Sequence, residues 1–176
     1  DYAQVIAREA KRVDGLVREL LDLARPAALQ TAPVDVHEVL GHVEVLARGI
    51  PGAERVAFVE RYDPSLPRVM GAAEKLKQVV LNLVLNGMDA VGGLDENARR
   101  ITVRTAALRD GVEVLVGDSG TGIDPAIASR LFDSFVTTKA HGMGLGLSIA
   151  RSIVEAHGIE VAAGAAGGTI FRFRLP

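Results

Sequence analysis

Two asparagines four residues apart, Asn82 and Asn86, lie in an otherwise apolar segment with helical periodicity over residues 74–91. Leucine and valine recur there at the spacing of one buried helix face, whereas the amides share another face with Lys75 and Asp89. Asparagine is a poor helix former and a buried amide needs a partner. An amide oxygen can ligate Mg²⁺ while triphosphate oxygens fill the remaining positions. The alternative is that both amides only cap or bridge neighbouring backbone.

Two glycine-rich motifs follow this helix. Asp118-Ser-Gly-Thr-Gly122 ends a hydrophobic strand, where a carboxylate can accept from an exocyclic amine and glycines let the backbone approach a flat ring. Gly142-Met-Gly-Leu-Gly146 opens a helix, so its free N–H groups and the helix dipole suit an anion. A plain turn and a flexible loop are the alternatives. No G-x-x-x-x-G-K-[ST] run exists, which excludes the common Walker loop.

The segment between the glycine motifs carries two aromatic residues and a lysine. Phe132 and Phe135 can anchor a short loop on the core, which frees Lys139 to reach a terminal phosphate. A solvated lysine is the alternative. The four segments in this order are far more specific than any one of them.

Hydrophobic patterning predicts the other elements of the main domain. Helices are expected at 36–48, with Asp35 as N-cap, and at 125–133 and 145–157. Strands are expected at 56–62, 101–108, 112–117, 159–163 and 169–175. The helices then lie on one side of a mixed, mostly antiparallel sheet, which is an α/β two-layer sandwich of the α+β class.

Residues 2–25 predict a separate long amphipathic helix, ended by Arg25-Pro26. Its apolar positions follow a seven-residue repeat: Ile6, Val13, Leu16, Leu20 and Leu23. One such helix cannot bury its own stripe, so we expect part of a dimerising bundle; an ordinary core helix is the alternative. The predicted division of the chain is helix 1–26, linker 27–35 and main domain 36–176.

Composition narrows the function classes. Hydrophobic residues make up 48% of the 176 residues, enough for a core, and a net charge of −2 argues against nucleic acid as the main partner. The absence of cysteine excludes disulfides, zinc–thiolate sites and cysteine nucleophiles, and fits a reducing, cytoplasmic setting. The longest apolar runs fall short of the roughly 20 residues of a membrane span. Because the chain begins with Asp1, we expect a fragment whose longer protein could be membrane-anchored.

Taken together, the motifs resemble the ATP-binding catalytic domain of sensor histidine kinases, in the ATPase superfamily shared with gyrase, MutL and the ninety-kilodalton chaperone. The resemblance implies a Bergerat-type ATP-binding fold. The segments similar to the family's asparagine, first glycine, phenylalanine, second glycine and last boxes are 82–90, 118–122, 132–139, 142–146 and 167–171. Residues 62–67 and 135–142 look most like the nitrogen-regulation subgroup. Gly87 departs from the family's usual alanine, which we expect to loosen the helix.

The resemblance implies a site for ATP and Mg²⁺. Asn86 is expected to ligate Mg²⁺, Asp118 to accept from the adenine amine, and Thr169 to support the adenine end. Asn82 and Lys139 are the expected catalytic residues, close to the phosphates and at the γ-phosphate respectively. The predicted nucleotide-binding set is completed by Asp89, Gly120, Gly122, Ile123, Thr138, Gly142, Gly144, Leu145, Gly146 and Leu147.

The residue at position 82 indicates which reaction the site supports. Hydrolytic members of the superfamily carry a glutamate there to activate water, and an amide cannot act as a general base. The resemblance therefore implies an ATP-dependent protein-histidine kinase of a two-component system. It transfers the γ-phosphate to a histidine, for relay to an aspartate on a response regulator receiver domain. A superfamily ATPase and a non-enzymatic, nucleotide-gated interaction module are the alternatives.

The phosphoacceptor is the missing part. Residues 2–25 resemble the second helix of the family's dimerisation hairpin, whose first helix carries the histidine and pairs the full-length protein as a homodimer. That first helix is absent from this sequence. His37, although followed by Glu38, lacks the remaining motif, and we expect an ordinary helix-surface residue.

Overall fold

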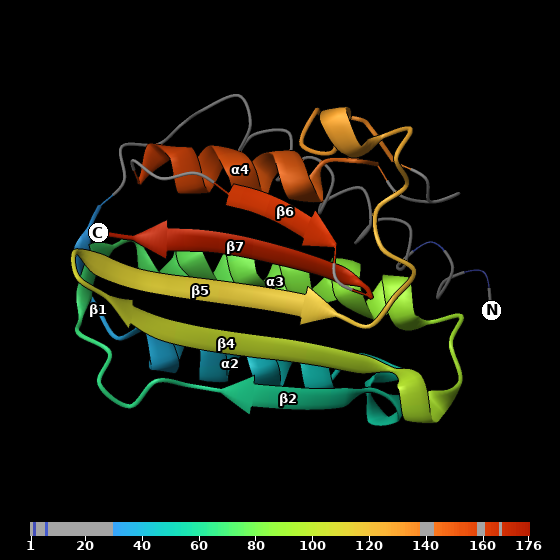
Figure 1. Ribbon diagram of the computed structural model, residues 1–176, viewed down its shortest axis with the longest axis horizontal. Helices are drawn as coiled ribbons and strands as arrows, with labels where there is room; N and C mark the ends of the chain where they lie inside the picture. The colour runs from blue at the N-terminus through green and yellow to red at the C-terminus, as the bar shows by residue number, and fades with distance from the viewer. Residues whose placement is uncertain (1, 3–5, 7–29, 138–142, 158–160, 166) are drawn as a thin grey trace.

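A five-stranded mixed sheet forms one layer of the computed structural model, which describes residues 2, 6, 30–137, 143–157, 161–165 and 167–176 (Figure 1). Its strand order is β2-β4-β5-β7-β6. β2 lies parallel to β4, and every other neighbouring pair is antiparallel. The strands are β2 (Ala57–Arg61), β4 (Arg100–Leu108), β5 (Gly111–Asp118), β6 (Val161–Ala165) and β7 (Thr169–Leu175).

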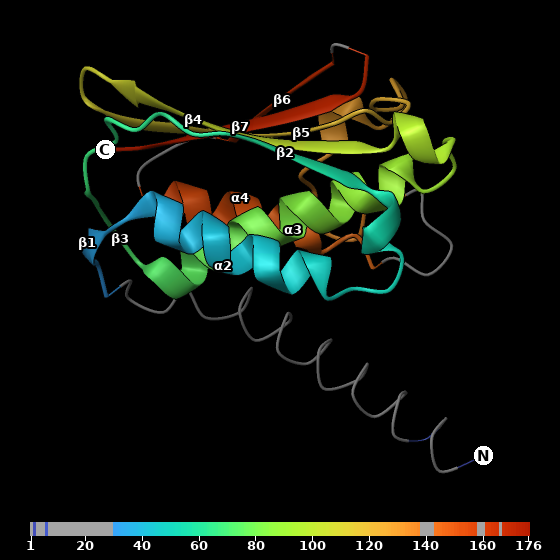
Figure 2. The same cartoon turned by 90° about the horizontal axis from the view of Figure 1, so that it is seen from below.

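Three helices form the second layer, all on the same face of the sheet, with α3 between α2 and α4 (Figure 2). They are α2 (Val36–Arg48), α3 (Ala73–Val91) and α4 (Gly146–Ala156). The Asp35 carboxylate caps α2 by accepting from the backbone N–H groups of His37 and Glu38, as predicted. The predicted α/β two-layer sandwich is confirmed. Among the described residues, none of the helices is long and apolar enough to cross a membrane.

Buried and outward-facing side chains alternate along the strands, and the buried ones pack the sheet against the helices. In β4, β5 and β7 every second side chain is buried against the helices, while the residues between them face the other side. Each fully buried large apolar side chain contributes roughly 1.5–3 kcal/mol relative to exposure. The largest of these are Leu76, Leu83, Ile101, Leu145, Phe173 and Leu175.

One predicted helix is wrong, and one pair of strands was not predicted. Residues 125–133 form no α-helix and contain only the 3-10 turn η3 (Ala128–Arg130), because no residue of that turn is buried to stabilise a helix. The predicted linker contains strand β1 (Ala32–Val34), which pairs antiparallel with β3 (Val69–Gly71). Three-residue strands are too short to show a period in sequence. Two further 3-10 turns are η1 (Ala53–Arg55) and η2 (Glu96–Ala98).

The predicted helix over 2–25 lies outside the described residues except for Tyr2 and Ile6. The proposed division of the chain at residue 26 therefore stays a prediction.

His37 is not an ordinary surface residue. Its ring stacks on Tyr62, with ring centroids 5.0 Å apart, and its Nε2 lies 3.1 Å from the hydroxyl of buried Thr105. The same hydroxyl accepts from the backbone N–H of Asp63 at 3.0 Å. The ring is half-buried because the first turn of α2 packs on the sheet. His37 thus holds α2 to the sheet.

His157 ties the end of α4 to the beginning of α3. Its Nδ1 lies 2.8 Å from the carbonyl of Ile153, and its Nε2 accepts from the backbone N–H of Ala72 at 3.1 Å. A carbonyl can only accept, so Nδ1 is the donor of this pair and Nε2 is the acceptor of the other. Ala72 is the N-cap of α3 and has no capping side chain. The imidazole therefore satisfies a backbone N–H at this end of the asparagine-bearing helix.

We expect His157→Asn to lower the free energy of unfolding by about 1–2 kcal/mol, because a shorter side chain cannot reach the Ala72 N–H. His157→Gln keeps an acceptor at similar reach and should cost less than half as much. Urea denaturation of both variants measures the difference. Equal losses would show that the bond to Ala72 does not stabilise the domain.

Glu44 on α2 and Glu60 on β2 form a carboxyl–carboxylate pair. The hydrogen bond from Glu60 lowers the pKa of Glu44, assisted by Arg48, whose Nε donates to Glu44 at 2.6 Å. The same hydrogen bond raises the pKa of Glu60, and burial adds to the effect. Protonated Glu60 therefore contributes to the free energy of unfolding at low pH. This contribution is lost as the pH rises through the raised pKa of Glu60. At neutral pH the two carboxylates repel.

Glu60→Gln should therefore raise the free energy of unfolding at pH 7 by about 0.5 kcal/mol, because the amide keeps a donor and removes a charge. At pH 4 the gain should disappear, since Glu60 is then protonated in the folded domain. Glu60→Ala, which removes the donor as well, is the control. The same gain for Gln at both pH values would contradict the shared-proton arrangement.

Candidate functional site

The second half of α3 and the beginning of α4 meet through their polar residues. The Asn82 Nδ2 donates to the carbonyl of Gly146 at 3.1 Å. A Cβ placed on Gly146 would lie 3.8 Å from the Asn82 Cγ and 3.9 Å from the Asn86 Nδ2. The structure therefore brings the asparagine pair against the second glycine motif, although 64 residues separate Asn82 from Gly146.

Asp118 lies at the end of β5, next to the beginning of β7. Its Oδ1 accepts from the backbone N–H of Gly120 at 2.8 Å and from that of Thr169 at 3.2 Å. Within the described ranges, its Oδ2 makes no hydrogen bond. That atom lies 3.9 Å from the position a Cβ would take on Gly87 of α3. The backbone thus orients the carboxylate and leaves one oxygen available beside the asparagine helix.

Two glycines that the predicted site did not include allow this arrangement. A Cβ on Gly87 would lie 2.7 Å from the Ile101 Cδ1 and 3.2 Å from the Asp118 Cβ, so glycine lets α3 approach β5 closely. Gly168 has φ 148° and passes against the Asp118 carbonyl, where any Cβ would overlap. A glycine inside a strongly apolar helix was the sequence signal for the first of these close approaches.

Positive φ angles mark the loops at the rim of the site. Gly122 has φ 84°, and Gly144 has φ 69°. The Phe135 N–H donates to the Gly144 carbonyl at 3.0 Å, and Phe135 itself has φ 68°. A Cβ on Gly144 would lie 2.5 Å from the Val136 carbonyl. The end of the phenylalanine segment therefore contacts the second glycine motif directly.

The remaining predicted residues differ in what they can offer a ligand. Leu145 is 1% exposed and Thr169 is 5% exposed, so their side chains belong to the interior, and the backbone N–H of Thr169 donates to Asp118. Ile123 and Leu147 are half-buried, and Asp89 is exposed on the same helix as the asparagines. Thr138, Lys139 and Gly142 lie outside the described residues.

The N-terminus of α4 supplies the positive potential that a phosphate needs. The first backbone N–H groups of this helix, which begins at Gly146, have no partner within the helix. Ser148 uses its hydroxyl to donate to the Leu145 carbonyl at 2.9 Å, so this side chain does not cap them. With the helix dipole, the site suits an anion.

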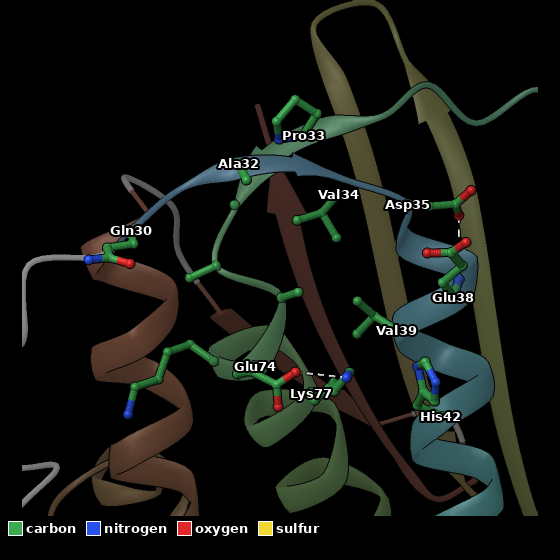
Figure 3. Close-up of a pocket in the computed structure, with 14 residues that line it drawn as sticks. Gln30, Ala32, Pro33, Val34, Asp35, Glu38, Val39, His42, Glu74 and Lys77 are labelled. Carbon is green, nitrogen blue, oxygen red and sulfur yellow. Dashed lines mark hydrogen bonds and ion pairs between the residues drawn. The ribbon is translucent and has the colours of Figure 1, made fainter.

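A separate cavity of about 550 Å³ lies beside β1 (Figure 3). It is lined by β1 and by the first turns of α2 and α3, and its Glu74 and Lys77 pair with each other at 2.8 Å. At 1.5 Å of rise per residue, Glu74 lies about 18 Å along the helix axis from Asn86. This cavity is therefore distinct from the asparagine and glycine site.

Comparison with protein families agrees with the motifs. Residues 71–176 match the family described as "Histidine kinase-, DNA gyrase B-, and HSP90-like ATPase". Sensor histidine kinase ZraS of Klebsiella oxytoca is 38% identical, over 99% of this chain and 37% of its own length. Sensory histidine kinase/phosphatase NtrB of Azospirillum brasilense is 37% identical, over 88% of this chain and 41% of its own. The chain thus spans about two fifths of these relatives.

Solved structures have the same fold. Full-length ShkA in complex with AMPPNP gives a TM-score of 0.83 at 29% identity, over 99% of this chain and 38% of that one. Histidine kinase ThkA in complex with the response regulator protein TrrA gives 0.80 at 28% identity, over 99% of this chain and 50% of that one. With the matched family model, these likenesses lead to one conclusion: the chain belongs to the histidine kinase-, DNA gyrase B- and HSP90-like ATPases, as the catalytic ATPase domain of a two-component sensor histidine kinase.

Proposed function

We propose that this domain binds Mg-ATP and transfers the γ-phosphate to a histidine on a separate helix. The observation that carries the proposal is Asn82, an amide held by its Nδ2 on the Gly146 carbonyl. An amide cannot take a proton from water, so the residue positions the phosphate region and does not activate a hydrolytic nucleophile. ATP is then retained until another acceptor reaches it.

Each end of the nucleotide has a matching group. The Asp118 Oδ2 accepts from the adenine amine, because Oδ1 is already used by two backbone donors. The free N–H groups at the beginning of α4 bind phosphate oxygens. Lys139 is the proposed cation at the γ-phosphate, and Thr138 and Gly142 are proposed nucleotide-binding residues.

The side chains present fit a magnesium ion that is shared with the nucleotide. No group of three or more histidines and carboxylates that could hold a metal exists among the described residues. Asn86 supplies a neutral oxygen, and Mg²⁺ accepts one or two protein ligands when phosphates and waters complete its shell. When bound, the ion neutralises charge on the triphosphate.

In the proposed transfer, a histidine ring nitrogen attacks the γ-phosphorus in line with the leaving oxygen. A nitrogen–phosphorus bond forms, the bond to the β,γ-bridging oxygen breaks, and ADP leaves. Asn82 orients the phosphate, and Lys139 neutralises part of its charge. Positioning and charge neutralisation together lower most of the barrier to phosphoryl transfer.

The phosphoacceptor histidine and the partner domains are proposed from the likeness to sensor histidine kinases. We propose that residues 2–25 are the second helix of a dimerisation hairpin, that the histidine lies on its first helix, and that the full-length protein is a homodimer. A response regulator receiver domain is the proposed next acceptor, in keeping with the ThkA–TrrA complex. The domain would operate on the cytoplasmic side, where ATP is available. The nitrogen-regulation subgroup stays a proposal, because ZraS and NtrB are about equally similar to this chain, at 38% and 37% identity.

The test is to mix the domain with the histidine-bearing hairpin of a similar sensor kinase and γ-labelled Mg-ATP. Acid-labile, base-stable label on the hairpin would support the proposal, and a hairpin with histidine replaced by alanine is the control. Free phosphate without labelled protein would move the domain to the ATPase class. Nucleotide binding with neither product would indicate an interaction module.

A further inference from the structure

The face of the sheet that points away from the helices is rich in arginine. The helices α2, α3 and α4, within the described part of the chain, all cover the other face (Figure 2). Along β4 and β7, every second residue points to this face. In β2, the residues paired in register with the outward residues of β4 point to the same face. The exposed outward residues with positive charge are Arg61, Arg100, Arg104, Arg172 and Arg174.

Part of this set lies in one row across the sheet. Arg61 is the register partner of Arg104, Arg104 is the partner of Leu115, and Leu115 is the partner of Arg172. Neighbouring strands are about 4.8 Å apart, and like charges directly opposite each other are destabilising. The Arg61–Arg104 pair therefore costs the isolated domain stability.

Negative charge on this face is scarce. Glu113 lies on β5 opposite Arg174; its Oε2 is 3.2 Å from the Arg174 Nε and 4.0 Å from the Arg172 Nε. Across the described part of the chain, Arg61, Arg100 and Arg104 make no ion pair. The sequence of β6 adds no charge. The face thus has a net positive charge of about four, although the whole chain has a net charge of −2.

We propose that this arginine face docks the acidic surface of a second folded protein domain. Guanidinium groups bind carboxylates in bidentate geometry, and the row of arginines matches a row of carboxylates on a flat partner. Between the arginines lie the half-buried aliphatic side chains of Leu115 and Ile170, which can be covered by such a partner. The proposal goes beyond nucleotide binding, because the asparagine helix lies on the opposite side of the sheet.

Other anionic partners fit this face less well. The large exposed hydrophobic residues of the described chain lie elsewhere, so the face has no anchor for a lipid surface: Tyr2, Ile6, Val45, Leu46, Met70 and Phe135. The net negative charge of the chain also opposes the long-range attraction that nucleic-acid binding uses. An acidic protein surface presents carboxylates, which guanidinium groups bind in bidentate geometry at short range.

The experiment measures binding of the domain to poly-L-glutamate at low salt, with double-stranded DNA and phosphatidylglycerol vesicles in parallel. Poly-L-glutamate should bind, and amide NMR shifts should change along β4, β5 and β7. The double variant Arg104→Glu/Arg172→Glu should weaken binding at least about tenfold. The double variant Arg55→Glu/Arg68→Glu makes the same change in net charge at two residues outside the five strands of this sheet, and it should weaken binding less than about threefold.

Folding and nucleotide binding are checked separately. Circular dichroism and ATP affinity should be unchanged in both double variants, so a failure of the nucleotide site is distinguishable from a failure of this proposal. Arg104→Glu alone should raise Tm slightly, because it places a carboxylate opposite Arg61. Equal weakening in the two doubles, or no binding of poly-L-glutamate, would mean that the arginines only keep the sheet solvated. DNA or vesicles bound as tightly as poly-L-glutamate through these residues would also overturn the proposal.

Discussion

Asp118→Asn should weaken ATP binding by about a hundredfold while changing the free energy of unfolding by less than about 1 kcal/mol. The asparagine Oδ1 can still accept from the N–H groups of Gly120 and Thr169, so the local backbone is preserved. The other carboxylate oxygen becomes an NH₂ group that meets the adenine amine, and two donors then face each other. The loss combines a missing charge-assisted hydrogen bond with an unsatisfied donor.

Isothermal titration calorimetry with ADP isolates this effect, because ADP has the adenine end and lacks the γ-phosphate. Asp124→Asn is the matched control: Asp124 lies on the same loop and is exposed, and among the described residues its carboxylate accepts only from the backbone N–H of Ala126. It should leave the affinity unchanged. An Asp118→Asn domain that binds ADP as tightly as the unmodified domain would remove Asp118 from the site.

Elements with a long, regular hydrophobic period could be predicted from the sequence. The 19-residue helix α3 and the β4–β5 hairpin show their buried faces at the helical and strand periods over many residues. β1 and β3 are three residues each and are stabilised by pairing with each other across a distance in sequence. Their pairing could not be predicted, because it depends on tertiary contact and not on local pattern.

The motifs of the proposed site could be recognised in the sequence, but the contacts between them could not. Sequence alone could indicate that Asn82 needs a partner, yet not that the partner is the Gly146 carbonyl. Gly87 was expected to loosen α3; in the structure its missing side chain lets the helix approach Ile101 and Asp118. Close approach of this kind depends on how two elements pack, which a single sequence does not record.

Asn86→Ala should abolish the gain in ATP affinity that Mg²⁺ provides, a loss of about tenfold when Mg²⁺ is present and little change in EDTA. The reason is that, in the proposed site, the Asn86 amide oxygen is the protein's own ligand to the ion. Titration of ATP with and without Mg²⁺ gives the ratio directly. If Mg²⁺ improves binding to the variant as much as it does to the unmodified domain, its ligand lies elsewhere.

Asn82→Ala distinguishes this metal effect from general damage to the site. Asn82 lies one turn earlier on the same helix and holds the Gly146 carbonyl, so its removal should weaken ATP binding equally with and without Mg²⁺. It should also lower the free energy of unfolding by about 1 kcal/mol, the net value of one hydrogen bond. The two asparagines would then have separable roles. Asn82 aligns the beginning of α4 with α3, and Asn86 binds the ion that neutralises charge on the triphosphate.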